Sequence, residues 1–494
     1  MSVKPFFETY RYTGEVARLF SQSIVECRLP GSEIGSVLAV QAKAVPTECA
    51  CADGEVRYGG KLYLCVLYED GDRRICRAER GAEFFHKAEG GVVSPACFAK
   101  VAFIVETVTY RREGSGLYVS AVVGAEANVY GGKQIDYLIG GEDISTKNES
   151  IALCKTVCVS GETEGEDEFE TSAGDILLHG ENAVVTACEV RAGQIEVRGE
   201  LCLNTCILCQ DQTVRNYERL IPFSMQIPCE EAFGRVGASA RVRVRSAQLT
   251  ADLDEEKGKC KIAFDYALSA DCFLHAKEEI SVAEDAFSTK CNLRLQVKKD
   301  GGRYLTNQVK CAQRVSGTAM LSPLVEGEYS LVSAVLPKAD IVCKRGENGF
   351  EAEGVLTAEV LLRSAEGGYR ASTLQLPFVF PLDADGAEIE ADCIVSGLNV
   401  RRKKDGETEA EATLKICLRV YEQAEWAYIK EVEEGETFAE NDASFSVYMP
   451  LVGEDLWQVA KRLHRQPEEL KKCNPTLEFP IKEGERIFVY RQIK

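Results

Sequence analysis

One pattern recurs three times along the chain and constrains the fold more than any other feature of the sequence. A glycine begins an alternating, strand-like run, and a phenylalanine follows 24 or 25 residues later. The pairs are Gly60 with Phe85, Gly199 with Phe223, and Gly354 with Phe378. The second and third copies share a Pro-Phe pair, whereas the first has Phe84-Phe85. Such self-similarity indicates one structural unit used three times.

A hairpin-like stretch follows each copy of the pattern. Apolar and polar residues alternate in these stretches with period two, which is typical of strands with one buried face. Polar turns such as Lys404-Asp405-Gly406 interrupt the alternation. Short strands with frequent turns favour antiparallel sheets in a sandwich or open barrel. The predicted fold class is therefore mainly β, with three tandem antiparallel β-sandwich-like repeats followed by a small βααβ module.

The divisions between these units are marked by similar segments. Residues 142–147 close the first copy and residues 284–290 close the second. We predict β domains at residues 1–150, which include an N-terminal segment, at 151–310 and at 311–436, and a terminal module at 441–494. The N-terminal segment is expected either to add a strand to the first domain or to lie across it. The acidic run at 431–436 is expected to be a linker.

Charge and composition narrow the possible partners. The net charge of the 494-residue chain is −20, and the longest basic cluster is the four residues 401–404. Nucleic acid and anionic membrane surfaces are therefore poor candidate partners. We find neither an export signal nor an apolar run long enough to span a bilayer, which predicts a cytoplasmic protein without membrane insertion. The 21 cysteines lie largely in strand-like runs and are expected to be reduced.

The last fifty residues have a different character. Between residues 447 and 489 the pattern predicts a strand, a helix opening at Gly453, a second helix starting at Pro467, a stop at Asn474-Pro475 and a final strand from Ile487 to Tyr490. Asp455 and Gln458 have the spacing of a capping box, and Pro467 suits a first helical turn. Trp457 is interpreted as a core anchor in preference to a ligand platform. The apolar face of the first helix is predicted to comprise Leu456, Val459, Ala460 and Leu463.

This βααβ pattern resembles a LysM module, a small unit that binds ligands and has no catalytic activity. In that family, glycans with N-acetyl groups lie in a shallow groove between two loops. The resemblance implies that the groove here is formed by Gly453, Glu454, Asp455 and Leu456 on one side, and by Asn474, Pro475, Thr476 and Leu477 on the other. The chain departs from the usual Pro-Gly-Asp-Thr start of the first loop, and its second loop is short.

Three β repeats followed by one LysM-like module resemble the SipL-type proteins of endospore-forming Firmicutes, whose repeat is called the SPOCS domain. The resemblance implies a role in the mother-cell cytoplasm during sporulation, at the forespore surface. Members of this family help to attach the spore coat by interacting with the morphogenetic ATPase SpoIVA. A SpoIVA-like ATPase is therefore an expected partner, and N-acetylglucosamine glycans are a possible one.

The sequence shows no catalytic motif. The four histidines lie outside patterns such as H-E-x-x-H, and the glycine pairs lack the spacing of a phosphate loop. Cys202, Cys206 and Cys209 are the best metal candidate, but Cys209 is expected on the opposite strand face from the other two. We therefore predict no cofactor, no metal and no enzymatic activity. Two hypotheses remain: a scaffold in endospore coat assembly, and a peptidoglycan-binding protein of the cell envelope.

Overall fold

The computed structural model describes residues 3–30, 34–114, 116–233, 236–254, 259–323, 329–347, 349–403, 406–438 and 445–490. The predicted mainly β class is confirmed, and all paired strands are antiparallel. The first six strands are β1 (Lys4–Leu29), β2 (Val37–Ala52), β3 (Glu55–Glu69), β4 (Ile75–Glu89), β5 (Phe98–Glu113) and β6 (Gly116–Glu142).

Two further groups of six strands follow in the same order. The second group is β7 (Ile144–Ser172), β8 (Gly174–Arg191), β9 (Gln194–Cys209), β10 (Val214–Pro228), β11 (Gly237–Asp254) and β12 (Lys259–Ser288). The third is β13 (Cys291–Ser322), β14 (Tyr329–Gly346), β15 (Gly349–Ser364), β16 (Tyr369–Pro381), β17 (Glu388–Arg402) and β18 (Thr408–Thr437).

In each group of six strands, two antiparallel layers pack face to face, and in the third group a short pairing of β13 with β16 joins the two layers. In the first group, β6 pairs with β1 and β5, and β3 pairs with β2 and β4. The other two groups repeat this pairing, with β12 and β18 in the place of β6 and β9 and β15 in the place of β3. Alternate side chains from both sheets fill the core between them, as Leu62 of β3 and Val119 of β6 do. The N-terminal segment thus belongs to β1 and pairs with β6.

The recurring glycine and phenylalanine lie directly opposite each other on paired strands in all three groups. The register pairs Gly199 with Phe223 and Gly354 with Phe378. In the first group, the partner of Gly60 is Phe84 and not the predicted Phe85. Phe84 is 7% exposed and Phe85 is 68% exposed, because adjacent strand residues point to opposite faces. The spacing is therefore 24 residues in all three copies.

The three groups pack against one another side by side. An apolar cluster contains residues at similar positions of each group, including Leu38 of β2, Leu178 of β8 and Val335 of β14. Ion pairs also cross the contacts between groups. Lys100 of β5 lies 2.9 Å from Asp271 of β12, and similar pairs connect the other groups. The three groups therefore form one continuous body.

The predicted divisions at 150/151 and 310/311 fall inside β7 and β13. In the structure, the chain passes from one group to the next at Asp143 and again at Thr289-Lys290. Because β1, β7 and β13 each continue far into their own group, the residues after 144 and 291 belong to the following group. The segments that the sequence analysis described as closing the copies each contain the end of one long strand and the turn to the next, at Asp143 and at Thr289-Lys290.

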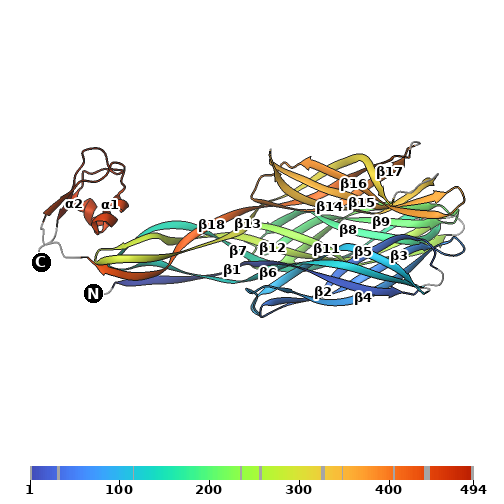
Figure 1. Cartoon of the computed structure of the whole chain (residues 1–494), viewed down its shortest axis with the longest axis horizontal. Helices are drawn as coiled ribbons and strands as arrows, with labels where there is room; N and C mark the ends of the chain where they lie inside the picture. Colours follow the sequence, from blue (N-terminus) through green and yellow to red (C-terminus); the bar gives the residue numbers. More distant parts are fainter. Residues whose placement is uncertain are drawn as a thin grey trace.

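The long strands extend beyond the body as a narrow stalk (Figure 1). It is built from the starts of β1, β7 and β13 and the ends of β6, β12 and β18, and aromatic residues such as Tyr137, Trp426 and Tyr428 fill its centre. The predicted linker 431–436 lies in β18 and is part of this stalk. The C-terminal module lies beyond the stalk tip (Figure 1). It comprises β19 (Phe445–Tyr448), α1 (Leu456–Leu463), α2 (Pro467–Cys473) and β20 (Ile487–Tyr490).

Candidate functional site in the C-terminal module

The C-terminal module is built around a small apolar core. Its two short strands, β19 and β20, pair antiparallel, and the helices α1 and α2 cover one face of that hairpin. Val459 and Ala460 of α1 are fully buried, and Leu456 and Leu463 are partly buried against them, so the predicted apolar face of α1 is confirmed. The module therefore has its own core, although a small one.

Both helices begin as their sequences predict. The Asp455 carboxylate accepts a hydrogen bond from the Gln458 backbone N–H at 2.7 Å, and the Gln458 side chain accepts one from the Asp455 N–H at 2.9 Å. This reciprocal arrangement is the predicted capping box. Pro467 is at the start of α2, where its missing N–H is not needed.

The first predicted groove loop uses its polar side chains for internal contacts. Glu454 is buried, and its carboxylate accepts a hydrogen bond from the Leu451 N–H at 2.8 Å and pairs with Arg462 at 2.7 Å. Gly453 has a φ of +90°, which favours glycine, and its N–H donates to the Ile481 carbonyl. Of the four predicted residues in this loop, Gly453 and Asp455 are exposed and Leu456 is half-buried.

The second predicted groove loop is held by Asn474. Its side-chain amide donates to the carbonyls of Leu470 and Phe488, and its oxygen accepts the Phe488 N–H at 2.8 Å. The buried Asn474 side chain therefore ties the end of α2 to β20. Pro475 and Thr476 are exposed, and Leu477 is partly buried in the module core. The exposed part of the two loops consequently consists of Gly453, Asp455, Pro475 and Thr476.

The module is attached to the stalk through α1. The Trp457 indole N–H donates to the Asp285 carboxylate of β12 at 2.9 Å, and Lys461 lies 2.6 Å from the same carboxylate. The Trp457 ring packs edge-to-face on Phe287, with the ring centres 5.0 Å apart. The predicted role of Trp457 as a core anchor is thus accompanied by a contact with the stalk.

Asp285 and Phe287 are contact residues that the sequence analysis did not identify. Both lie in the segment 284–290, which was used there only as a mark of the repeat. A signal was present, because residues 142–147 have no phenylalanine at the corresponding place. Burial alone would raise the pKa of Asp285, but its hydrogen bonds from Lys461 and Trp457 lower the pKa below its usual value.

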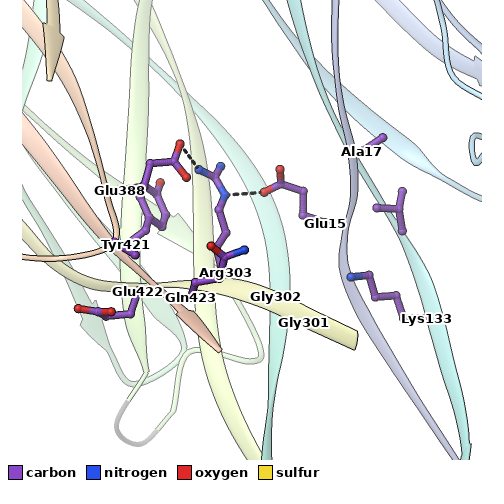
Figure 2. Close-up of a pocket in the computed structure, with 12 residues that line it drawn as sticks. Glu15, Ala17, Lys133, Gly301, Gly302, Arg303, Glu388, Tyr421, Glu422 and Gln423 are labelled. Atoms are coloured by element: carbon purple, nitrogen blue, oxygen red, sulfur yellow. Dashed lines mark hydrogen bonds and ion pairs between the residues drawn. The ribbon is translucent and has the colours of Figure 1, made fainter. Parts of the chain in front are cut away.

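A second candidate is a polar pocket of about 210 Å³ at the neck between stalk and body. Figure 2 shows Arg303 between Glu15 and Glu388, at 2.9 and 3.3 Å. Nearby, Glu390 of β17 contacts arginines from all three groups of strands. They are Arg18 of β1, Arg241 of β11, Arg303 of β13 and Arg419 of β18.

This arginine network is paired with carboxylates throughout. Burial alone would raise the pKa of Glu390, but the charges of Arg241, Arg419 and Arg303 hold it well below its usual range. Glu390 is therefore ionised and neutralises arginines that the fold buries. A charge arrangement of this kind connects structural elements, and the residues that line the pocket at the neck include no nucleophile paired with a base. We therefore interpret the arginine network and the pocket beside it as structural features that hold the strands together.

The cysteines do not form a ligand cluster. All 21 thiols are free, and only Cys49 is exposed. Cys202 donates to the Val395 carbonyl, whereas Cys206 and Cys209 lie in two different apolar clusters. Within the described ranges, no group of three or more His, Cys, Asp or Glu side chains is arranged to hold a metal ion.

Neither helix of the described structure has the length and apolarity needed to cross a membrane. Comparisons with protein-family models, with curated proteins and with solved structures find no match to this chain.

Proposed function

We propose that the protein is a non-enzymatic adaptor that holds a small protein-binding module at the end of a β stalk. The observation that carries this proposal is the position of the module. It lies at the stalk tip, attached by α1, while its two loops leave Gly453, Asp455, Pro475 and Thr476 accessible. Long strands and buried ion pairs would stiffen the body and stalk, so that the module is held at a fixed distance from the body.

The loops suit a protein surface better than a sugar. Sugar recognition depends on several polar groups that converge on the ligand. Here the carboxylates of Glu454 and Asp455 and the amide of Asn474 all make hydrogen bonds within the module. Because these polar groups are already used within the module, the loops favour the adaptor over the peptidoglycan-binding alternative.

The resemblance to SipL-type proteins suggests a setting for the adaptor. On this proposal the module is a LysM-like fold that binds a SpoIVA-like morphogenetic ATPase, the body consists of SPOCS-like repeats, and the protein acts in coat assembly at the forespore surface in the mother cell. The body would present the docking surfaces from which the coat is built.

Binding of the full chain to the purified SpoIVA-like ATPase and to a chitin-type oligosaccharide tests this function. We expect binding to the ATPase and none to the sugar. Thr476→Arg changes an exposed loop position and should weaken ATPase binding at least tenfold. Glu469→Arg, at an exposed position of α2, is the matched control and should bind normally. Binding to the sugar alone would contradict the adaptor function and would show that the protein binds glycans.

A further inference from the structure

The outer face of the module hairpin is apolar and uncovered in the described structure. Five side chains form this surface, which we call the hairpin face, and they are between 39% and 60% exposed: Phe445, Val447, Met449, Phe488 and Tyr490. Large apolar side chains that are exposed singly are common, but a contiguous set on one small module indicates a contact surface.

Strand pairing brings four of the five side chains together, and Met449 follows Val447 two residues along the chain. Phe445 pairs directly with Tyr490, and Val447 pairs with Phe488, across β19 and β20. The rings of Phe445 and Phe488 stack with centres 5.9 Å apart, and Phe445 and Tyr490 lie 5.1 Å apart. The alternate residues of the same strands point the other way, into the module core.

The charge of the module differs from that of the whole chain. Residues 445–490 contain seven basic and seven acidic residues, so their net charge is zero, whereas the chain carries −20. The strands β19 and β20 contain no charged residue. Two copies of the chain would repel each other through their acidic bodies, and the neutral module is the part at which they can meet.

The size of the hairpin face fits a contact between two proteins. Its five side chains expose on the order of 500 Å² of apolar surface, taking about 200 Å² for a large side chain. A standard interface buries about 800 Å² per partner, of which a little over half is apolar. One hairpin face therefore supplies the apolar part of one side of such an interface.

We propose that two copies of the chain associate through their hairpin faces into a tip-to-tip dimer. The two hairpins would pack face to face, so that each copy buries the same residues in a two-fold contact. The stalk keeps the acidic bodies apart, because β1 pairs with β6 from Lys4 to Gly14 before it reaches the neck at Glu15, roughly 35 Å of strand. That separation exceeds the screening length of about 8 Å at physiological salt.

The dimer would make the adaptor bivalent. The exposed loop residues Asp455 and Thr476 are outside the hairpin face, and Trp457 and Lys461 face the stalk. Each copy would therefore keep its loops available for a partner while its hairpin is covered. This inference rests on the packing of β19 and β20 and stands whether or not the proposed partner is correct.

Sedimentation velocity of the full chain over a wide concentration range tests the proposal. We expect a species of twice the 54.3 kDa chain mass that persists at high salt, because the contact is apolar. Phe488→Lys and Val447→Lys place a charge on exposed positions, so the monomer fold should survive while the dimer is lost. Val379→Lys, at a position of β16 that is 66% exposed, is the control and should remain dimeric.

Two results would overturn the dimer. One is a monomer at every concentration, which would assign the hairpin face to a different protein. The other is a dimer that Phe488→Lys leaves intact, which would place the contact elsewhere. Circular dichroism of the variants excludes unfolding as the cause of dissociation. ATPase binding by Phe488→Lys separates this proposal from the adaptor function, because the monomeric variant should still bind through its loops.

Discussion

At the scale of single residues, the glycine opposite each phenylalanine explains why the pattern recurs. A Cβ atom at Gly199 would lie 2.2 Å from the Phe223 ring and 2.4 Å from the Val184 carbonyl oxygen. Carbonyl oxygens of a paired strand cannot move aside without breaking the sheet. Gly199→Ala should therefore lower the free energy of unfolding by about 2 kcal/mol, as overpacking does. Urea denaturation measures this loss.

The control for that substitution is Gly132→Ala, in strand β6. No atom lies within 4 Å of a Cβ built there, so alanine should leave stability unchanged or raise it slightly. Equal losses in both variants would show that the phenylalanine ring is not the reason for glycine at position 199.

His275 is a second residue with a measurable consequence. It lies beside Ser239 and Tyr421, and near Arg303 and Glu390. Burial lowers the pKa of His275 to about 4, and the Arg303 charge acts in the same direction. The unfolded chain thus binds a proton between about pH 6.5 and pH 4 that the folded chain does not, so stability falls as pH falls through this range.

The pH dependence of unfolding tests this effect. Between pH 7 and pH 4.5, the wild type should lose about 2 kcal/mol more stability than His275→Gln, which cannot take up the proton. Because both proteins share the same carboxylates, the difference isolates His275. Parallel curves for the two proteins would contradict a buried neutral imidazole.

At the scale of elements, α1 has two roles in one helix. Its buried face forms the module core, and Trp457 and Lys461 attach it to Asp285. Asp285→Ala removes both polar contacts, so Trp457 should become more exposed and its fluorescence should shift to longer wavelength. Glu284→Ala, which affects only a surface pair with Lys147, should leave the spectrum unchanged. An unshifted spectrum in Asp285→Ala would show that the docking does not depend on this carboxylate.

At the scale of the whole molecule, Glu390 connects the three groups of strands. Its side chain is 12% exposed and contacts arginines from each group. Glu390→Gln would take one carboxylate away from four arginines at once, including Arg241, whose ion-pair partner is Glu390, and we expect a loss of about 3 kcal/mol or more. Glu388→Gln, at a position 45% exposed, should cost about 1 kcal/mol at most. Calorimetry should show one transition that moves as a whole; separate transitions would show that the groups unfold independently.

Local patterns predicted much of the fold. Alternation predicted the mainly β class, and short-range rules predicted the capping box of Asp455 and the start of α2 at Pro467. The partner of Gly60 was misassigned, because Phe84 and Phe85 are adjacent and only the strand register distinguishes them. The divisions at 150 and 310 were misplaced, because alternation continues through a turn as short as Asp143.

Contacts between residues far apart in the chain could not be predicted from the sequence. Arg18 and Glu390 are 372 residues apart, and nothing in either segment indicates the other. Two of the eight predicted groove residues, Glu454 and Asn474, are buried. Their side chains make hydrogen bonds to backbone groups of the module and are therefore turned inward. The exposed hairpin face also depends on the pairing of β19 with β20, which brings together residues from both ends of the module.

The most direct test of the account compares ATPase binding by the full chain with binding by a chain ending at Phe438, which lacks the module and keeps the stalk and body. Surface-immobilised SpoIVA-like ATPase and either protein in solution would serve. We expect the full chain to bind, and removal of the module to abolish binding while the body stays folded. Equal binding by both proteins would place the partner on the β body and would contradict the central role assigned to the module.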